Sequence, residues 1–146
     1  MPTLFDIEMA FDFVSSASED ENTAAYDRVS DRFYYYSESG ELDEFPEDLD
    51  WEQCVEVPHK NDLDLGNRLV FRFARRAISG EEEAVRRFFQ RPGAYARYKD
   101  FLDRRGLLQA WYDFASSARR AAIEDWCREN EVPITSEESP GSLAKN

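Results

Sequence analysis

Beyond a short N-terminal segment, the spacing of apolar residues changes once along this chain, close to Pro58. Before it, aromatic and apolar residues come in short runs separated by turn residues, as in strands. After it they recur every three or four residues, as in amphipathic helices. Strands followed by helices favour an α+β fold. We therefore expect a small three-stranded antiparallel sheet in the N-terminal half, packed on a four-helix C-terminal half, with a short helix at the N-terminus.

One helix and three strands are expected before Pro58. Thr3 and Asp6 have the spacing of a capping box, which predicts a helix over residues 4–16. The aromatic run 33–36 does not alternate, so both faces of its strand should be partly covered. The expected strands are residues 24–28, 32–37 and 53–57.

Four helices are expected after Pro58. Asn61 or Asp62 can cap the first, and Ser79 with Glu82 has the capping-box spacing that opens the second. The longest helix should extend over about residues 107–130. The length predicts a single domain over residues 1–134, followed by a disordered tail at 135–146, which lacks the apolar residues that would order it.

The charges of the two halves have opposite signs. The net charge is −13, but residues 1–66 hold 19 acids and 3 bases, whereas residues 67–134 hold 10 acids and 14 bases. Acidity of the whole chain argues against non-specific binding to nucleic acid or to anionic membranes, yet it leaves room for a basic face in the second half. No apolar run approaches the ~20 residues of a membrane span. We expect a cytoplasmic protein without a membrane partner.

Arginines dominate the basic half and form its candidate binding surface. Guanidinium groups suit bidentate contacts to carboxylate or phosphate, and tyrosines lie between them in the sequence. One interpretation is a surface for an acidic partner or for nucleic acid, and the other is that the arginines neutralise the acidic half within the fold; charge complementarity favours the second. The partner-binding candidates are Arg68, Arg72, Arg75, Arg76, Arg97, Tyr95 and Tyr98.

A polar cluster lies where the strands give way to helices. His59, Lys60, Asp62 and Asp64 could surround an anion site at a helix N-terminus, or they could simply cap the helix, which is the more common role. A calcium loop starting at Asp62 is excluded because its twelfth position is Phe73. His59 is the only histidine, and no nucleotide-binding, zinc or triad motif is present. We expect no metal, no cofactor and no catalytic residues.

Five segments, in this order, resemble the small bacterial proteins of uncharacterised protein family 0158: LFDIEMAFDFVS, PHKNDLDLGNRLVFRFA, GAYARYKDFL, GLLQAWYDF and DWCREN. Two positions depart from that pattern, since the turn 29–31 lacks an expected glycine and Glu131 stands where glycine is common. The resemblance implies a bacterial cytoplasmic protein. It implies no activity and assigns no functional residues.

Three functions stay open. The leading hypothesis is a non-enzymatic protein-interaction or regulatory protein of the bacterial cytoplasm, because tyrosine, tryptophan and arginine are enriched at interfaces. A homodimer is a further possibility, since the two halves are oppositely charged. The first alternative is a nucleic-acid-binding protein that uses the arginine-rich helices. The second is an inhibitor whose acids over residues 38–56 mimic a phosphate backbone, although most acidic runs only solubilise a loop.

Overall fold

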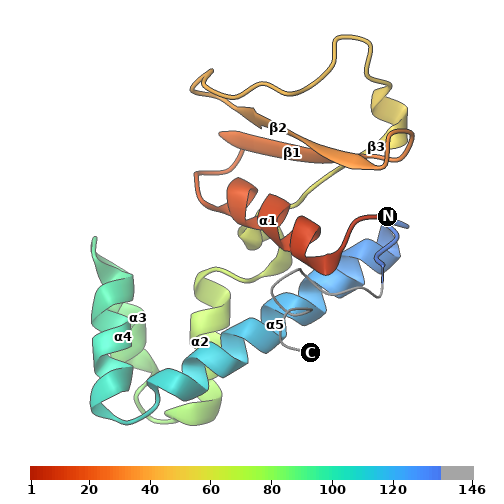
Figure 1. Ribbon diagram of the computed structural model, residues 1–146. Helices are drawn as coiled ribbons and strands as arrows, with labels where there is room; N and C mark the ends of the chain where they lie inside the picture. Colours follow the sequence, from red (N-terminus) through yellow and green to blue (C-terminus); the bar gives the residue numbers. More distant parts are fainter. Residues whose placement is uncertain (136–146) are drawn as a thin grey trace, which may run out of the picture. The chain divides into compact units, whose positions relative to one another are not determined.

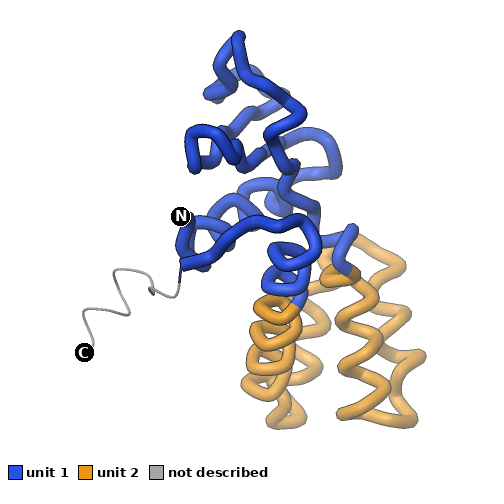
Figure 2. Tube along the Cα trace, turned by 90° about the vertical axis from the view of Figure 1, so that its right-hand side faces the viewer, with its two compact units in different colours: residues 1–63, 122–146 blue, residues 64–121 orange. Residues whose placement is uncertain are grey.

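The computed structural model describes residues 1–135, which divide into two compact units (Figure 2). Among the described residues, unit 1 comprises 1–63 and 122–135, and unit 2 comprises 64–121. The predicted single domain over residues 1–134 spans parts of both units and stays a prediction. The predicted tail falls outside the described residues, except for Thr135, whose amide donates to the Pro2 carbonyl at 2.9 Å.

Unit 1 begins with helix α1 (Leu4–Ser15), and its predicted capping box is confirmed. The Asp6 amide donates to Thr3 Oγ1 at 3.1 Å, and the Thr3 amide donates to the Asp6 carboxylate at 2.9 Å. These bonds satisfy amides that have no partner within the first turn of a helix. The helix buries one side, made of Ile7, Ala10, Phe11 and Val14.

The three-stranded antiparallel sheet is confirmed, with β1 (Asn22–Asp27) between β2 (Arg32–Ser37) and β3 (Cys54–Glu56). Helix α1 lies along one face of this sheet (Figure 1). There the Phe13 ring meets Tyr35 of β2 edge to face, with centroids 5.1 Å apart. On the opposite face, the ring centroids of Phe45 and Tyr34 are 6.3 Å apart. Both faces of β2 are thus partly covered, as the aromatic run predicted.

Two short 3-10 helices, η1 (Trp51–Gln53) and η2 (Lys60–Leu63), were not predicted. The second changes where the next helix begins. Helix α2 (Asn67–Ala77) does not begin at Asn61 or Asp62, because these residues belong to η2. Gly66 is the N-cap residue of α2 and makes no side-chain capping bond.

Unit 2 continues with α3 (Glu82–Phe88), α4 (Ala94–Arg104) and the first part of α5 (Leu108–Glu129). The predicted capping box of α3 is wrong, since Glu81 is its N-cap residue and the Glu82 carboxylate accepts from the Gly80 amide at 2.9 Å. The core of unit 2 is aromatic. Trp111 is 3% exposed, and its ring centroid lies 5.1 Å from that of Tyr98 and 5.5 Å from that of Phe73.

The C-terminal end of α5 has the hydrogen bonds of a Schellman motif. The Val132 amide donates to the Cys127 carbonyl at 2.8 Å, and the Glu131 amide to the Arg128 carbonyl at 3.4 Å. This motif requires a left-handed residue after the helix, and Glu131 has φ 54°. A side chain disfavours that conformation, and glycine does not. The guanidinium of Arg28 donates to the Asn130 and Glu131 carbonyls and holds this end in place.

Replacing Glu131 by glycine should therefore stabilise the protein, with the free energy of unfolding rising by about 1 kcal/mol. Glu129→Gly is the matched control. It puts the same residue two positions earlier, at the last residue of α5, where the backbone is helical, and should lower the free energy of unfolding slightly instead of raising it. Urea unfolding measures both changes. Equal effects of the two substitutions would show that residue 131 is not held in the left-handed conformation.

Neither cysteine of the described chain is in a disulfide. Burial raises the pKa of the Cys127 thiol to about 11, so this thiol is protonated at neutral pH. Burial also raises the pKa of Cys54. Among residues 1–135, no helix combines the length and the apolar character that crossing a membrane requires.

Candidate functional site

Helix α2 has exposed arginines on one side and buried apolar residues on the other. Its buried residues are Leu69, Val70, Phe73 and Ala74, which face the core of unit 2. Arg68, Arg72 and Arg75 follow one another at spacings of four and three residues, which keeps their side chains on one face. All three are exposed. The helix thus fixes three guanidinium groups on the surface of unit 2.

These three arginines line a groove together with Phe71 and with Arg86 of α3. We call it the arginine groove; its volume is about 450 Å³. Phe71 is half-buried, and the Arg86 guanidinium carbon lies 4.5 Å from its ring centroid. Phe71 also meets the Phe89 ring edge to face at 5.8 Å. The groove therefore combines an aromatic wall with four guanidinium groups.

Most of the positive charge in the arginine groove is unpaired. Arg68 bonds to the Asp64 carboxylate at 3.2 Å, and both groups are exposed, so this pair is weak. Within residues 1–135, no carboxylate lies within 4.0 Å of the basic nitrogens of Arg72, Arg75 or Arg86. Unit 2 as a whole holds 13 basic and 7 acidic residues, a net charge of +6. Such a groove suits carboxylate or phosphate groups.

The remaining partner-binding candidates divide into surface and structural residues. Arg76 is exposed and shares the Phe114 ring with Arg72, each guanidinium carbon lying 5.6 Å from its centroid. Arg97 donates to the Phe88 and Arg91 carbonyls at 3.1 and 3.2 Å, so it ties the connection between α3 and α4 to α4. Its role is structural.

The two tyrosine candidates also differ. Tyr95 is 45% exposed, and its hydroxyl accepts from Trp111 Nε1 at 3.0 Å. Tyr98 has no exposed surface, and burial raises the pKa of its hydroxyl. The prediction that Tyr98 contributes to a binding surface is corrected, because its ring packs in the core of unit 2. Phe71 and Arg86 were not among the candidates. The signal for Phe71 was its position outside the predicted apolar stripe of α2.

The polar cluster does not converge on one point. His59 is 6% exposed, and both of its ring nitrogens bond to backbone groups. Nδ1 accepts from the Asn61 amide at 3.1 Å, so Nε2 carries the proton and donates to the Ala17 carbonyl at 2.9 Å. The Asp62 carboxylate accepts from the His59 amide at 3.0 Å. These bonds close the turn before η2, which is a capping role.

The other two members of the cluster have different partners from those of His59. Lys60 is exposed, and its backbone amide donates to Ser15 Oγ at 3.0 Å. Asp64 belongs to unit 2 and pairs with Arg68. His59 and Asp62 line a cleft of about 430 Å³ in unit 1, whose other acidic residues are Glu19, Asp20 and Glu56. In the described part of the chain, no three histidine, cysteine, aspartate or glutamate side chains are placed to hold a metal ion.

Replacing His59 by alanine should destabilise the protein by about 2 kcal/mol, because the Ala17 carbonyl and the Asn61 amide lose a buried partner. Lys60→Ala is the matched control next to it and should change stability by less than about 0.5 kcal/mol, since that side chain is exposed. Denaturant unfolding measures both. A stable His59→Ala protein would mean that the ring does not close the turn.

The chain matches no family model, no curated protein and no solved structure. The resemblance to uncharacterised protein family 0158 therefore stays a prediction.

Proposed function

We propose that this chain is a non-enzymatic protein that binds an acidic segment of another protein through the arginine groove. The observation that carries the proposal is the set of three guanidinium groups, those of Arg72, Arg75 and Arg86, without a carboxylate within 4.0 Å among residues 1–135. Charge that the fold leaves unpaired is available to a partner. Following the resemblance stated above, we place this activity in the bacterial cytoplasm.

The shape and chemistry of the groove favour a short protein segment. A volume of about 450 Å³ accommodates a few side chains. Phe71 offers an aromatic surface beside the guanidinium groups, which suits a segment with both acidic and apolar residues. The guanidinium fork then contacts each carboxylate in a bidentate manner, which gives direction as well as affinity.

Charge outside unit 2 also favours a short segment over a nucleic acid. The residues outside unit 2 hold 24 acids and 5 bases, a net charge of −19. This excess of negative charge repels a long polyanion. A short acidic segment that fits within the arginine groove interacts mainly with the positive charges that line it. The guanidinium groups would nevertheless accept phosphate, so the decisive experiment compares the two anions.

The experiment uses fluorescence anisotropy with the full chain and two labelled probes. One is a short peptide rich in glutamate with a phenylalanine in its middle, and the other is a mixed-sequence single-stranded oligonucleotide. The proposal predicts saturable binding of the peptide that persists at physiological salt, and weak oligonucleotide binding that disappears as salt rises. Tight, steeply salt-dependent binding of the oligonucleotide with no binding of the peptide would instead identify a nucleic-acid-binding protein.

A further inference from the structure

The face of the sheet opposite α1 carries a second surface, in unit 1. Phe45 follows β2 in the chain and stacks on its outer side, with its ring centroid 6.3 Å from Tyr34 and 6.4 Å from Tyr36. Trp51 of η1 extends this group, at 4.9 Å from Phe45. We call these four residues the aromatic face. Trp51 is 56% exposed and the other three rings are half-buried, so Trp51 is the part of the aromatic face that is most open to a partner.

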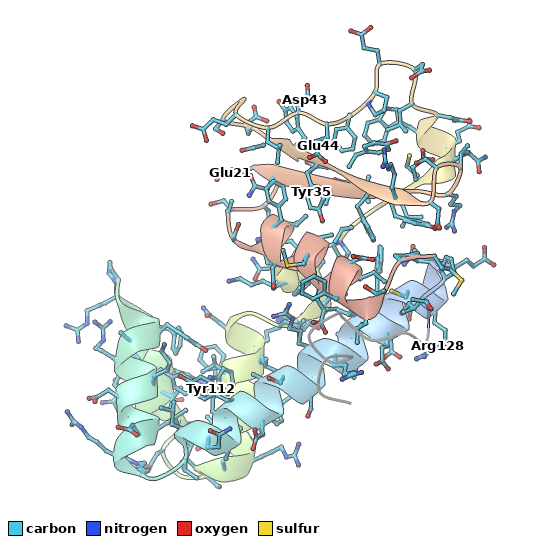
Figure 3. The ribbon with its side chains drawn as sticks, in the orientation of Figure 1. Glu21, Tyr35, Asp43, Glu44, Tyr112 and Arg128 are labelled. Atoms are coloured by element: carbon cyan, nitrogen blue, oxygen red, sulfur yellow. The ribbon has the colours of Figure 1, made fainter. Side chains whose placement is uncertain are left out.

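Several acidic residues flank the aromatic face in the chain. Asp43 and Glu44 precede Phe45, and they lie beside β2 in Figure 3. Asp50 and Glu52 stand on either side of Trp51 in the sequence. The stretch 38–52 contains eight acids and no base. Within the described residues, none of these carboxylates has a basic nitrogen within 4.0 Å. One exposed ring, three half-buried rings and negative charge without a basic partner therefore occur together in this part of unit 1.

A guanidinium group already lies against this surface. The guanidinium carbon of Arg32 is 6.0 Å from the centroid of the Tyr34 ring, which is the outer limit of a cation–π contact. Aromatic rings attract cations through their negative faces, and carboxylates nearby add to that attraction. The chemistry of the aromatic face thus matches an arginine or lysine side chain better than an acidic or purely apolar one.

We propose that the aromatic face binds a cationic segment of a partner protein, with an arginine side chain stacked on Trp51 and its guanidinium group near Glu52. The acids of the stretch 38–52, which have no basic partner within 4.0 Å among the described residues, supply the charge complementarity, and the rings supply the contact surface. This binding surface belongs to unit 1, so the proposal is independent of the arginine groove in unit 2. A phosphate-bearing partner is repelled here, because the stretch 38–52 carries eight acids and no base.

The experiment measures binding of a labelled arginine-rich peptide to the full chain by anisotropy, with a glutamate-rich peptide of equal length as the negative probe. Trp51→Ala removes the stacking surface and Glu52→Lys reverses one charge beside it. Each should weaken binding by about tenfold. Glu129→Lys makes the same charge change at an exposed position of α5 and should bind like the unchanged protein.

Tryptophan fluorescence provides an independent readout. Trp111 and Trp126 are 3% and 8% exposed, so Trp51 is the tryptophan that acrylamide reaches most easily. The arginine-rich peptide should protect the fluorescence from acrylamide, and the glutamate-rich peptide should not. The proposal is overturned if Trp51→Ala and Glu52→Lys both bind like the unchanged protein. It is also overturned if the chain alone sediments as an oligomer that Glu52→Lys dissociates, since the occupant would then be a second copy.

Discussion

Replacing Arg72 and Arg75 together by glutamate should weaken binding of the glutamate-rich peptide on the order of a hundredfold. Both side chains line the arginine groove, and neither has a carboxylate partner within 4.0 Å among residues 1–135. The double substitution removes two charge-assisted hydrogen-bonding groups and adds two negative charges that repel the peptide. Because both positions are exposed, the free energy of unfolding should change little.

The matched control is the double substitution of Arg87 and Arg91 by glutamate. It changes the net charge of unit 2 by the same amount at exposed positions that do not line the groove. It should lower peptide affinity only slightly, and only at low salt, because that effect acts through the long-range field. Equal losses in the two double variants would show that peptide binding follows net charge and not the groove.

Replacing Trp111 by alanine should lower the free energy of unfolding by about 4 kcal/mol, the range expected for a large aromatic residue in a core. Trp111 is 3% exposed and packs against three further rings besides bonding through Nε1 to the Tyr95 hydroxyl. The substitution leaves a cavity where several helices of unit 2 meet. Thermal or urea unfolding monitored by circular dichroism measures the loss.

Trp51→Ala is the comparison for this loss, because it makes the same substitution at a ring that is 56% exposed. It should cost less than about 1 kcal/mol, since more than half of Trp51 is already exposed and the ring contact that is lost is the one with Phe45. If both substitutions destabilised the protein equally, the aromatic cluster around Trp111 would not be the core of unit 2. The two variants also separate stability from binding. Trp51→Ala should weaken binding of the arginine-rich peptide while changing the free energy of unfolding little.

Local sequence signals predicted much of the fold correctly. The capping box of Thr3 and Asp6 depends on neighbouring residues alone, and it forms as expected. The start of α2 was misplaced for a physical reason. Asn61 and Asp62 have good capping side chains, but Asp62 bonds to the His59 amide and the His59 ring bonds to the Asn61 amide. The competing 3-10 turn depends on a long-range contact with Ala17, which no local pattern contains.

The division into two units was not predictable from local patterns either. It depends on which residues meet across long stretches of sequence, and α5 supplies residues to both units. At the two places where the sequence lacks a glycine expected from the resemblance, the backbone is left-handed: Asp31 and Glu131 have φ values of 59° and 54°. Asp31 differs from Glu131, because its carboxylate accepts hydrogen bonds from the Tyr26 hydroxyl and the N-terminal amine. A glycine at position 31 would remove both bonds.

The arginine groove was predicted in part. The spacing of Arg68, Arg72 and Arg75 placed them on one helix face, and the structure agrees. Arg86 completes the groove from the next helix, and only the packing of α2 on α3 brings it there. Tyr98 was misplaced because a tyrosine on an amphipathic helix fits a surface or a core equally well. Its position four residues before Leu102, which is also buried, favours the core.

The most direct test of the central claim observes the guanidinium groups themselves. In nitrogen-15-labelled protein, the Nε–Hε resonances of arginine side chains report on carboxylates that bind them. Titration with the glutamate-rich peptide should shift the resonances of Arg72, Arg75 and Arg86, which line the arginine groove, and leave that of Arg104 unchanged, because it lies on α4 and pairs with Asp100. Shifts spread evenly over the arginines of unit 2, or confined to those outside the groove, would contradict the account.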